Sequence, residues 1–203
     1  MSDSKNPLEP LERAHEESYF HRQDQKLIEQ LREKMTRQQN AEAIRAETGL
    51  TDDALLAKLA ELGVEKQTIP VLHLMPLIQV AWADGEIQAG ERELLMEAAE
   101  ATGVTSGPAR EALESMLEKR PSDEYFDAAL GFIHHMVAAL PGGEGEKAKA
   151  NLVDLAWRVA DASGGVFGLW GRVEDSEKQV LKAIAEKLTD GHGDAADKLL
   201  GKL

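Results

Sequence analysis

A short residue pattern that occurs twice places the strongest constraint on how this chain of 203 residues can fold. Each copy contains a glycine, then an aliphatic residue and then a glutamate at matching spacing: Gly85, Ile87 and Glu91 in the first copy, Gly171, Val173 and Glu177 in the second. The similarity continues downstream in pairs of related type: Leu94 with Val180, Leu95 with Leu181, Ala98 with Ile184, Ala99 with Ala185 and Glu100 with Glu186. Upstream, Ala83-Asp84 matches Ala160-Asp161, with nine extra residues before the second glycine. The repeat predicts two copies of one unit, in which an apolar helix, a turn and an acidic helix start follow one another.

The composition of the whole chain is typical of helix. Ala, Leu, Glu and Lys recur throughout, aromatic residues make up only 4%, and no period-2 run of β-branched residues is long enough for a strand. Capping and turn residues bound the helices that we expect: one that starts at Thr51-Asp52-Asp53 and ends at Gly63, and others at 69–83, 89–102, 107–119, 122–140, 146–161 and 175–189. The sequence therefore predicts an all-α fold built as a compact helical bundle.

The amino-terminal part of the chain differs in character. Glu9 to Lys34 holds seven acidic and five basic residues, and its apolar side chains are few. Phe20, Leu27, Leu31 and Met35 nevertheless fall on one face of a helix, as a thin stripe. We therefore expect an extended, charged helical arm. The domain organisation predicted from the sequence is an arm at 1–45, a connecting helix at 46–66, the main helical domain at 67–190 and a short polar tail at 191–203.

Charge narrows the range of partners. The formal net charge is −14, so contact with nucleic acid or with an anionic membrane surface would be repulsive, and we expect neither. Cations and basic protein surfaces remain compatible with this charge. The longest uncharged run, Gln67 to Ala83, is too short and too interrupted by proline for a membrane span. With no apolar signal segment at the start and no cysteine, a cytoplasmic location is the default expectation.

The acidic turns invite comparison with calcium loops. Asp-Gly-x-Ile-x-x-x-Glu matches the second half of an EF-hand, but the positions two and four residues before Asp84 are Trp82 and Val80, which offer no ligand. A single turn therefore lacks enough oxygen ligands. If the two copies pack together, their carboxylates could share a Ca²⁺ or Mg²⁺ ion: Asp84, Glu86 and Glu91 with Asp161, Glu174, Asp175 and Glu177. The alternative is that Glu91 and Glu177 only stabilise the helix dipole in first helical turns.

Residues 67–190 resemble the TerB tellurite-resistance family, on the strength of Ala-Asp-Gly-Glu and Glu91 within Ile78 to Gly103 and of the second copy within Trp157 to Leu188. The resemblance implies a bundle of roughly seven helices, a broad association with tellurite resistance and stress responses, and acidic residues proposed to bind a divalent cation. The metal residues carried over by matching are Asp84, Glu86, Glu91, Asp161 and Glu177. The glycine-rich insert at 162–170 departs from the family pattern.

The arm has a resemblance of its own. Ala14-His15-Glu16-Glu17-Ser18-Tyr19-Phe20, followed by Gln23 and Leu31, is similar to the inhibitory helix of the mitochondrial ATP synthase inhibitor protein. The resemblance implies that the arm inserts into an ATPase as a regulatory inhibitor. A solvated helix whose two aromatic residues pack on its own domain is the other interpretation. If the arm docks on a protein partner, we expect Tyr19, Phe20, Leu27 and Leu31 to contact that partner.

No motif for catalysis accompanies these features. The chain has no HExxH, Walker loop or GxSxG, and no plausible pairing of a nucleophile with a base. The function expected from the sequence is thus non-enzymatic: a TerB-like, stress-associated module that binds a divalent cation at its paired acidic turns and docks a protein partner.

Overall fold

The structure is a computed structural model, and it describes residues 9–141, 143–163 and 175–189, with the backbone alone for 9–21. The helices, from first to last, are α1 Glu9–Thr48, α2 Asp53–Glu61, the 3-10 turn η1 Lys66–Thr68, α3 Ile69–Leu72, α4 Met75–Ala81, α5 Ala89–Ala101, α6 Gly107–Glu118, α7 Asp123–Ala138, α8 Glu144–Ser163 and α9 Asp175–Leu188. No strand occurs in these ranges. The predicted all-α class is therefore confirmed.

The chain divides into two units between Gln39 and Asn40, inside α1. In the first unit, every side chain from Arg22 to Gln39 is exposed. The second unit takes up the end of α1, where Ile44 is fully buried, as is Leu50 beyond it. Within the segment 46–66, predicted to connect the arm to the main domain, the structure has the last residues of α1, the expected helix α2 and the start of η1.

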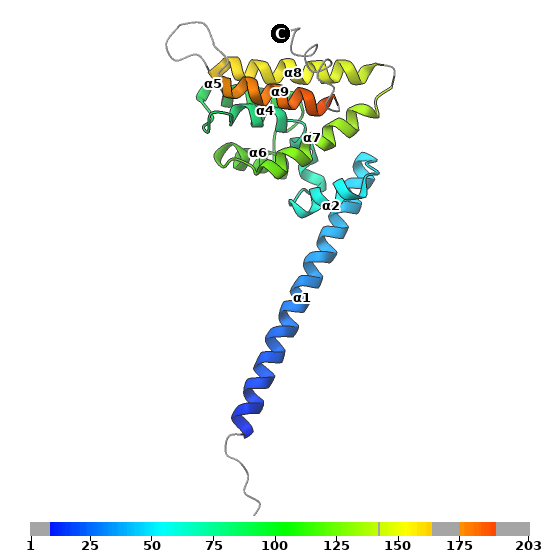
Figure 1. Cartoon of the computed structure of the whole chain (residues 1–203), viewed down its shortest axis with the longest axis vertical. Coiled ribbons are helices and arrows are strands. Elements are labelled where there is room, and N and C mark those ends of the chain that lie inside the picture. The colour runs from blue at the N-terminus through cyan, green and yellow to red at the C-terminus, as the bar shows by residue number, and fades with distance from the viewer. Residues whose placement is uncertain (1–8, 142, 164–174, 190–203) are drawn as a thin grey trace, which may run out of the picture. The chain divides into compact units, whose positions relative to one another are not determined.

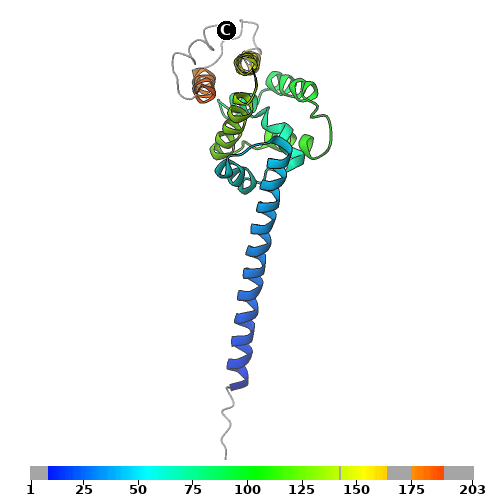
Figure 2. The ribbon, with the colours of Figure 1, turned by 90° about the vertical axis from the view of Figure 1, so that its right-hand side faces the viewer.

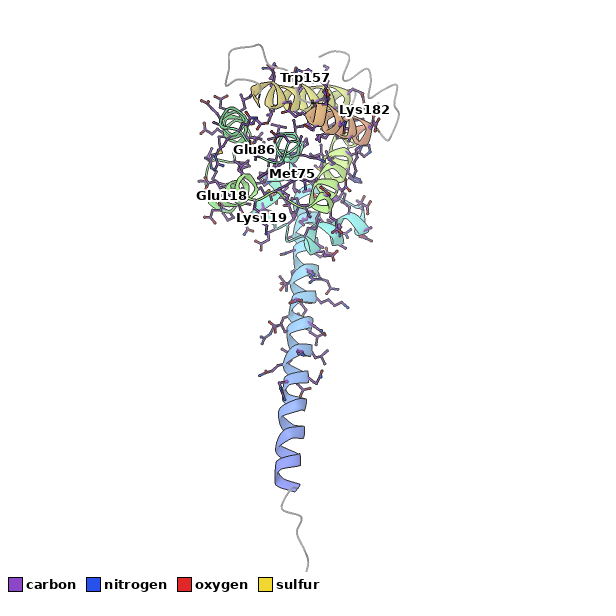
Figure 3. The ribbon with its side chains drawn as sticks, turned by 60° about the vertical axis from the view of Figure 1, so that its left-hand side comes forward. Met75, Glu86, Glu118, Lys119, Trp157 and Lys182 are labelled. Atoms are coloured by element: carbon purple, nitrogen blue, oxygen red, sulfur yellow. The ribbon has the colours of Figure 1, made fainter. Side chains whose placement is uncertain are left out.

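The second unit has its core around α4. Met75, Leu77, Ile78 and Val80 are each 0% exposed, and α4 packs against α5, α7, α8 and α9 (Figure 1). Met75 is surrounded by these helices in Figure 3. A helix that is apolar on all sides must be covered on all sides, which explains why the longest uncharged run of the sequence lies here.

Local capping sets several helix boundaries. The carboxylate of Asp52 accepts hydrogen bonds from the backbone N–H groups of Ala54 and Leu55, at 2.9 and 3.0 Å, and so begins α2 where the sequence predicted. The hydroxyl of Ser122 accepts from the N–H of Tyr125 in the same way at α7. Such side-chain acceptors satisfy N–H groups that have no partner within the helix.

The helix expected at 69–83 is broken into α3 and α4. Pro76 has no N–H to donate to the carbonyl of Leu72, and its ring crowds that carbonyl. The chain therefore leaves the helix at His73 and starts again at Met75. With this break, the described part of residues 67–190 holds seven α-helices, α3 to α9.

Among the described residues, no helix is both long enough and apolar enough to cross a membrane.

Candidate functional site

The two copies of the repeat pack against each other. The first copy comprises α4 and α5, the second α8 and α9, and α8 contacts both α4 and α5 (Figure 1). α4 also packs against α9. Figure 2 looks almost along the axes of α8 and α9, which lie side by side with roughly parallel axes. The helices of one copy are thus covered by helices of the other, which is the arrangement that a shared acidic site requires.

The closest approach between the copies lies at Gly90, in the first turn of α5. A Cβ atom built there would stand 2.9 Å from the carbonyl oxygen of Ala162, near the end of α8. Only a residue without a side chain allows this contact. The start of α5 in the first copy therefore meets the end of α8 in the second, one residue from Glu91 and one from Asp161.

The first acidic turn is well defined. Gly85 has a φ of +100°, a conformation that L side chains rarely adopt, so the turn needs glycine as the sequence predicted. One carboxylate oxygen of Asp84 accepts a hydrogen bond of 3.1 Å from the N–H of Glu86. Both side chains are exposed, and Glu86 lies in the turn between α4 and α5 (Figure 3). The carboxylate of Asp84 thus holds the turn in place.

Glu91 and Glu177, the matching glutamates of the two copies, are buried. They are 1% and 2% exposed, whereas the other acidic residues whose side chains the structure describes are nearly all at the surface. The carboxylate of Glu91 accepts a hydrogen bond of 2.7 Å from the N–H of Gln88, the residue before α5. A helix-capping role therefore accounts for part of the burial of Glu91, because a carboxylate satisfies an N–H that the helix leaves without a partner.

The described residues place the predicted metal residues in two groups. Asp84 and Glu86 are exposed in the turn before α5, Asp161 is exposed near the end of α8 and not in a turn as expected, and Glu91 and Glu177 are buried. Within the described part of the chain, no three of its His, Asp and Glu side chains come close enough to hold one ion. Glu174 lies outside the described residues. The packing of the copies brings the start of α5 to the end of α8, but a complete ligand set does not appear in the described ranges.

A second candidate surface lies on α1. Leu27, Leu31 and Met35 are 55%, 53% and 58% exposed, which is unusual for side chains of this size. They are four residues apart and share one face of the helix. Tyr19 and Phe20 belong to the same helix, but their side chains lie outside the described residues. We call Leu27, Ile28, Leu31 and Met35 the arm stripe.

The sequence analysis did not identify two residues of these candidate sites, Ile28 and Gly90. Ile28, 48% exposed, widens the arm stripe, and its position next to Leu27 could have shown this. Gly90 makes the contact between the copies. Its signal was a glycine inside the first turn of a predicted helix, a position that costs helix stability unless close packing requires it.

Comparison of the chain with protein-family models, with curated proteins and with solved structures found no match.

Proposed function

We propose that this chain is a non-enzymatic, TerB-like module that docks a protein partner through α1. The observation that carries the proposal is the exposure of the arm stripe. Its four large apolar side chains lie on one face of α1 and remain between 48% and 58% exposed. Apolar side chains gathered on one side of a charged helix are typical of a helix that binds a partner along that side.

The size of the arm stripe sets a limit on the affinity. Covering the exposed half of one such side chain contributes roughly 1 kcal/mol, so the four contribute about 4 kcal/mol. Association costs at least about 4 kcal/mol in lost translational and rotational freedom. The arm stripe alone therefore gives little net affinity. A stable complex needs further contacts, which Tyr19 and Phe20 would supply in the docking proposed here.

The docking role is tested by capture of partners with the full chain. The double variant Leu27→Gln with Leu31→Gln should lose the captured protein, because it removes the centre of the arm stripe. Glu29→Gln with Glu33→Gln is the matched control, since both residues are exposed on the opposite side of α1 and should leave capture unchanged. Equal capture by all three proteins would exclude the arm stripe as the docking face.

A second part of the proposal is that the paired acidic turns bind Ca²⁺ or Mg²⁺. The observation in its favour is that Glu91 and Glu177 are buried at matching positions of copies that pack together. Buried carboxylates are stabilised by a cation, and hard oxygen ligands suit these two ions. Such an ion would join the copies and fits the stress-associated role that the TerB resemblance implies.

Ion binding is tested by thermal or urea unfolding with and without each ion. An ion that binds the folded state should raise the free energy of unfolding by about 2.7 kcal/mol at a hundred times Kd. Asp84→Asn and Glu91→Gln should each abolish this rise. Glu93→Gln, which removes one exposed charge from α5, should not. If millimolar Ca²⁺ and Mg²⁺ both leave unfolding of the wild-type protein unchanged, the two glutamates are helix caps only.

A further inference from the structure

The arm stripe is part of a longer pattern on α1. Residues at alternating spacings of four and three form one seam along the helix: Phe20, Asp24, Leu27, Leu31, Lys34 and Gln38. This spacing is the heptad pattern by which two helices pack side by side. Two leucines form the middle of the seam, and Asp24 and Lys34 stand on either side of them as opposite charges. Ile28 and Met35 broaden one flank.

The two charges of the seam make it self-complementary in one orientation only. If a second α1 runs antiparallel, with Leu27 of each copy against Leu31 of the other, then Asp24 of each copy faces Lys34 of the other. In a parallel pair, each seam residue meets its own counterpart, so aspartate faces aspartate and lysine faces lysine. Both side chains are exposed, and neither forms an ion pair within the described part of the chain.

The charge of the whole arm agrees with this orientation. From Glu9 to Gln25 the sequence has five acidic and two basic residues, whereas from Lys26 to Gln39 it has two acidic and four basic residues. An antiparallel pair places the acidic half of each helix beside the basic half of the other. Opposite charges that flank a seam determine which partner and which orientation a helix accepts.

We propose that the occupant of the arm stripe is a second copy of this chain, bound antiparallel through the seam from Phe20 to Gln38. This inference rests on the docking role proposed above and names its partner. Two copies cover both stripes at once, so the four exposed apolar side chains of each copy leave water together. The overlapping segments, about 20 residues at 1.5 Å each, extend over roughly 30 Å.

The first experiment measures the mass of the full chain by sedimentation equilibrium over micromolar to millimolar concentration. We expect a reversible monomer–dimer equilibrium that added salt shifts toward monomer, because the pairs of Asp24 with Lys34 are screened. Leu27→Gln with Leu31→Gln should be monomeric throughout, whereas Glu29→Gln with Glu33→Gln should dimerise like the wild type. A wild-type chain that stays monomeric at millimolar concentration overturns the inference.

The second experiment tests orientation by exchanging charges. Asp24→Lys alone places lysine against lysine twice in an antiparallel pair, and Lys34→Asp alone places aspartate against aspartate. Each should raise the dimer Kd by about tenfold or more. Combining both substitutions in one chain, or mixing the two single variants, restores opposite charges at every contact and should return the Kd to near the wild-type value. In a parallel pair, neither single substitution creates a new repulsion, so unchanged dimerisation of the single variants overturns the antiparallel arrangement.

The result separates the identity of the occupant from the docking role itself. Suppose that the wild-type chain is monomeric and captures a protein that the Leu27→Gln, Leu31→Gln variant does not capture. The docking proposal then stands, and the proposal that the partner is a second copy of this chain is wrong. If that variant loses neither a dimer nor a captured protein, both proposals fail.

Discussion

Gly90 is the residue at which the two copies approach most closely, and its substitution gives a direct test of their packing. In Gly90→Ala, the new Cβ would stand 2.9 Å from the carbonyl oxygen of Ala162, a backbone atom that cannot turn away. The helices must then shift apart. We expect the free energy of unfolding to fall by about 1–3 kcal/mol, measured by urea denaturation.

Gly131 provides the matched control for this substitution. It also lies inside a helix, but a Cβ there would find its nearest atom, a Leu55 methyl carbon, at an ordinary distance of 3.6 Å. Because alanine favours helix over glycine, Gly131→Ala should leave stability unchanged or raise it by up to about 1 kcal/mol. Equal effects of the two substitutions would contradict the close contact at Gly90.

Tyr125, in the first turn of α7, gives a prediction for alkaline pH. Burial raises the pKa of its phenol to about 12, from 10.0 in the unfolded chain. Between these values the unfolded chain binds fewer protons than the folded one, so stability falls as pH rises, by up to about 1.4 kcal/mol per pH unit. Tyr125→Phe has no proton to lose. The difference in stability between wild type and variant should therefore change between pH 10 and 12 and stay constant below pH 9.

At the scale of single elements, the helices that local residues define could be predicted. Asp52 begins α2 with its own side chain, and Gly85 takes the positive φ that its turn demands. The break between α3 and α4 could also have been foreseen, since Pro76 lies in the middle of the expected helix. The burial of Ile44, near the end of α1, could not have been predicted, because it depends on how the helices of the second unit pack in three dimensions.

The candidate site was predictable to a similar extent. The spacing of Leu27 and Leu31 identified an apolar face, and the exposure of that face in the structure agrees with it. The repeat showed which glutamates correspond, but not that Glu91 and Glu177 are buried. Burial follows from how α5 and α9 pack in three dimensions, and an acidic residue at a helix start gives no sign of it.

The arm, as an element, should contribute little to the stability of the second unit. Every described side chain from Arg22 to Gln39 is exposed, so deletion of residues 1–39 should change the free energy of unfolding by no more than about 1 kcal/mol in dilute protein. Deletion of 1–48 is the comparison. It removes Ile44, which is 0% exposed, and should cost about 2–5 kcal/mol. A large loss from the shorter deletion would mean that arm residues belong to the core.

At the scale of the whole molecule, the alternative function is inhibition of an ATPase by the arm. If that function is correct, the full chain should inhibit purified bacterial F-type ATPase in a steady-state hydrolysis assay. Tyr19→Ala with Phe20→Ala should abolish inhibition, because aromatic anchors dominate helix docking. Glu29→Gln with Glu33→Gln should inhibit like the wild type. Hydrolysis unaffected by a large excess of the full chain would contradict this alternative.

The packing of α4 against α8 and α9 has a consequence for how the protein is made. On the ribosome, α4 emerges long before α8 and α9, so the part of its apolar surface that these two helices cover stays open until they have been synthesised. The second unit therefore completes its core only after α9 has been synthesised. Because α4 lies before residue 138 and two of the helices that cover it lie after residue 144, we expect that a chain divided between Ala138 and Glu144 gives two fragments that do not fold alone. The two fragments should assemble when they are synthesised together.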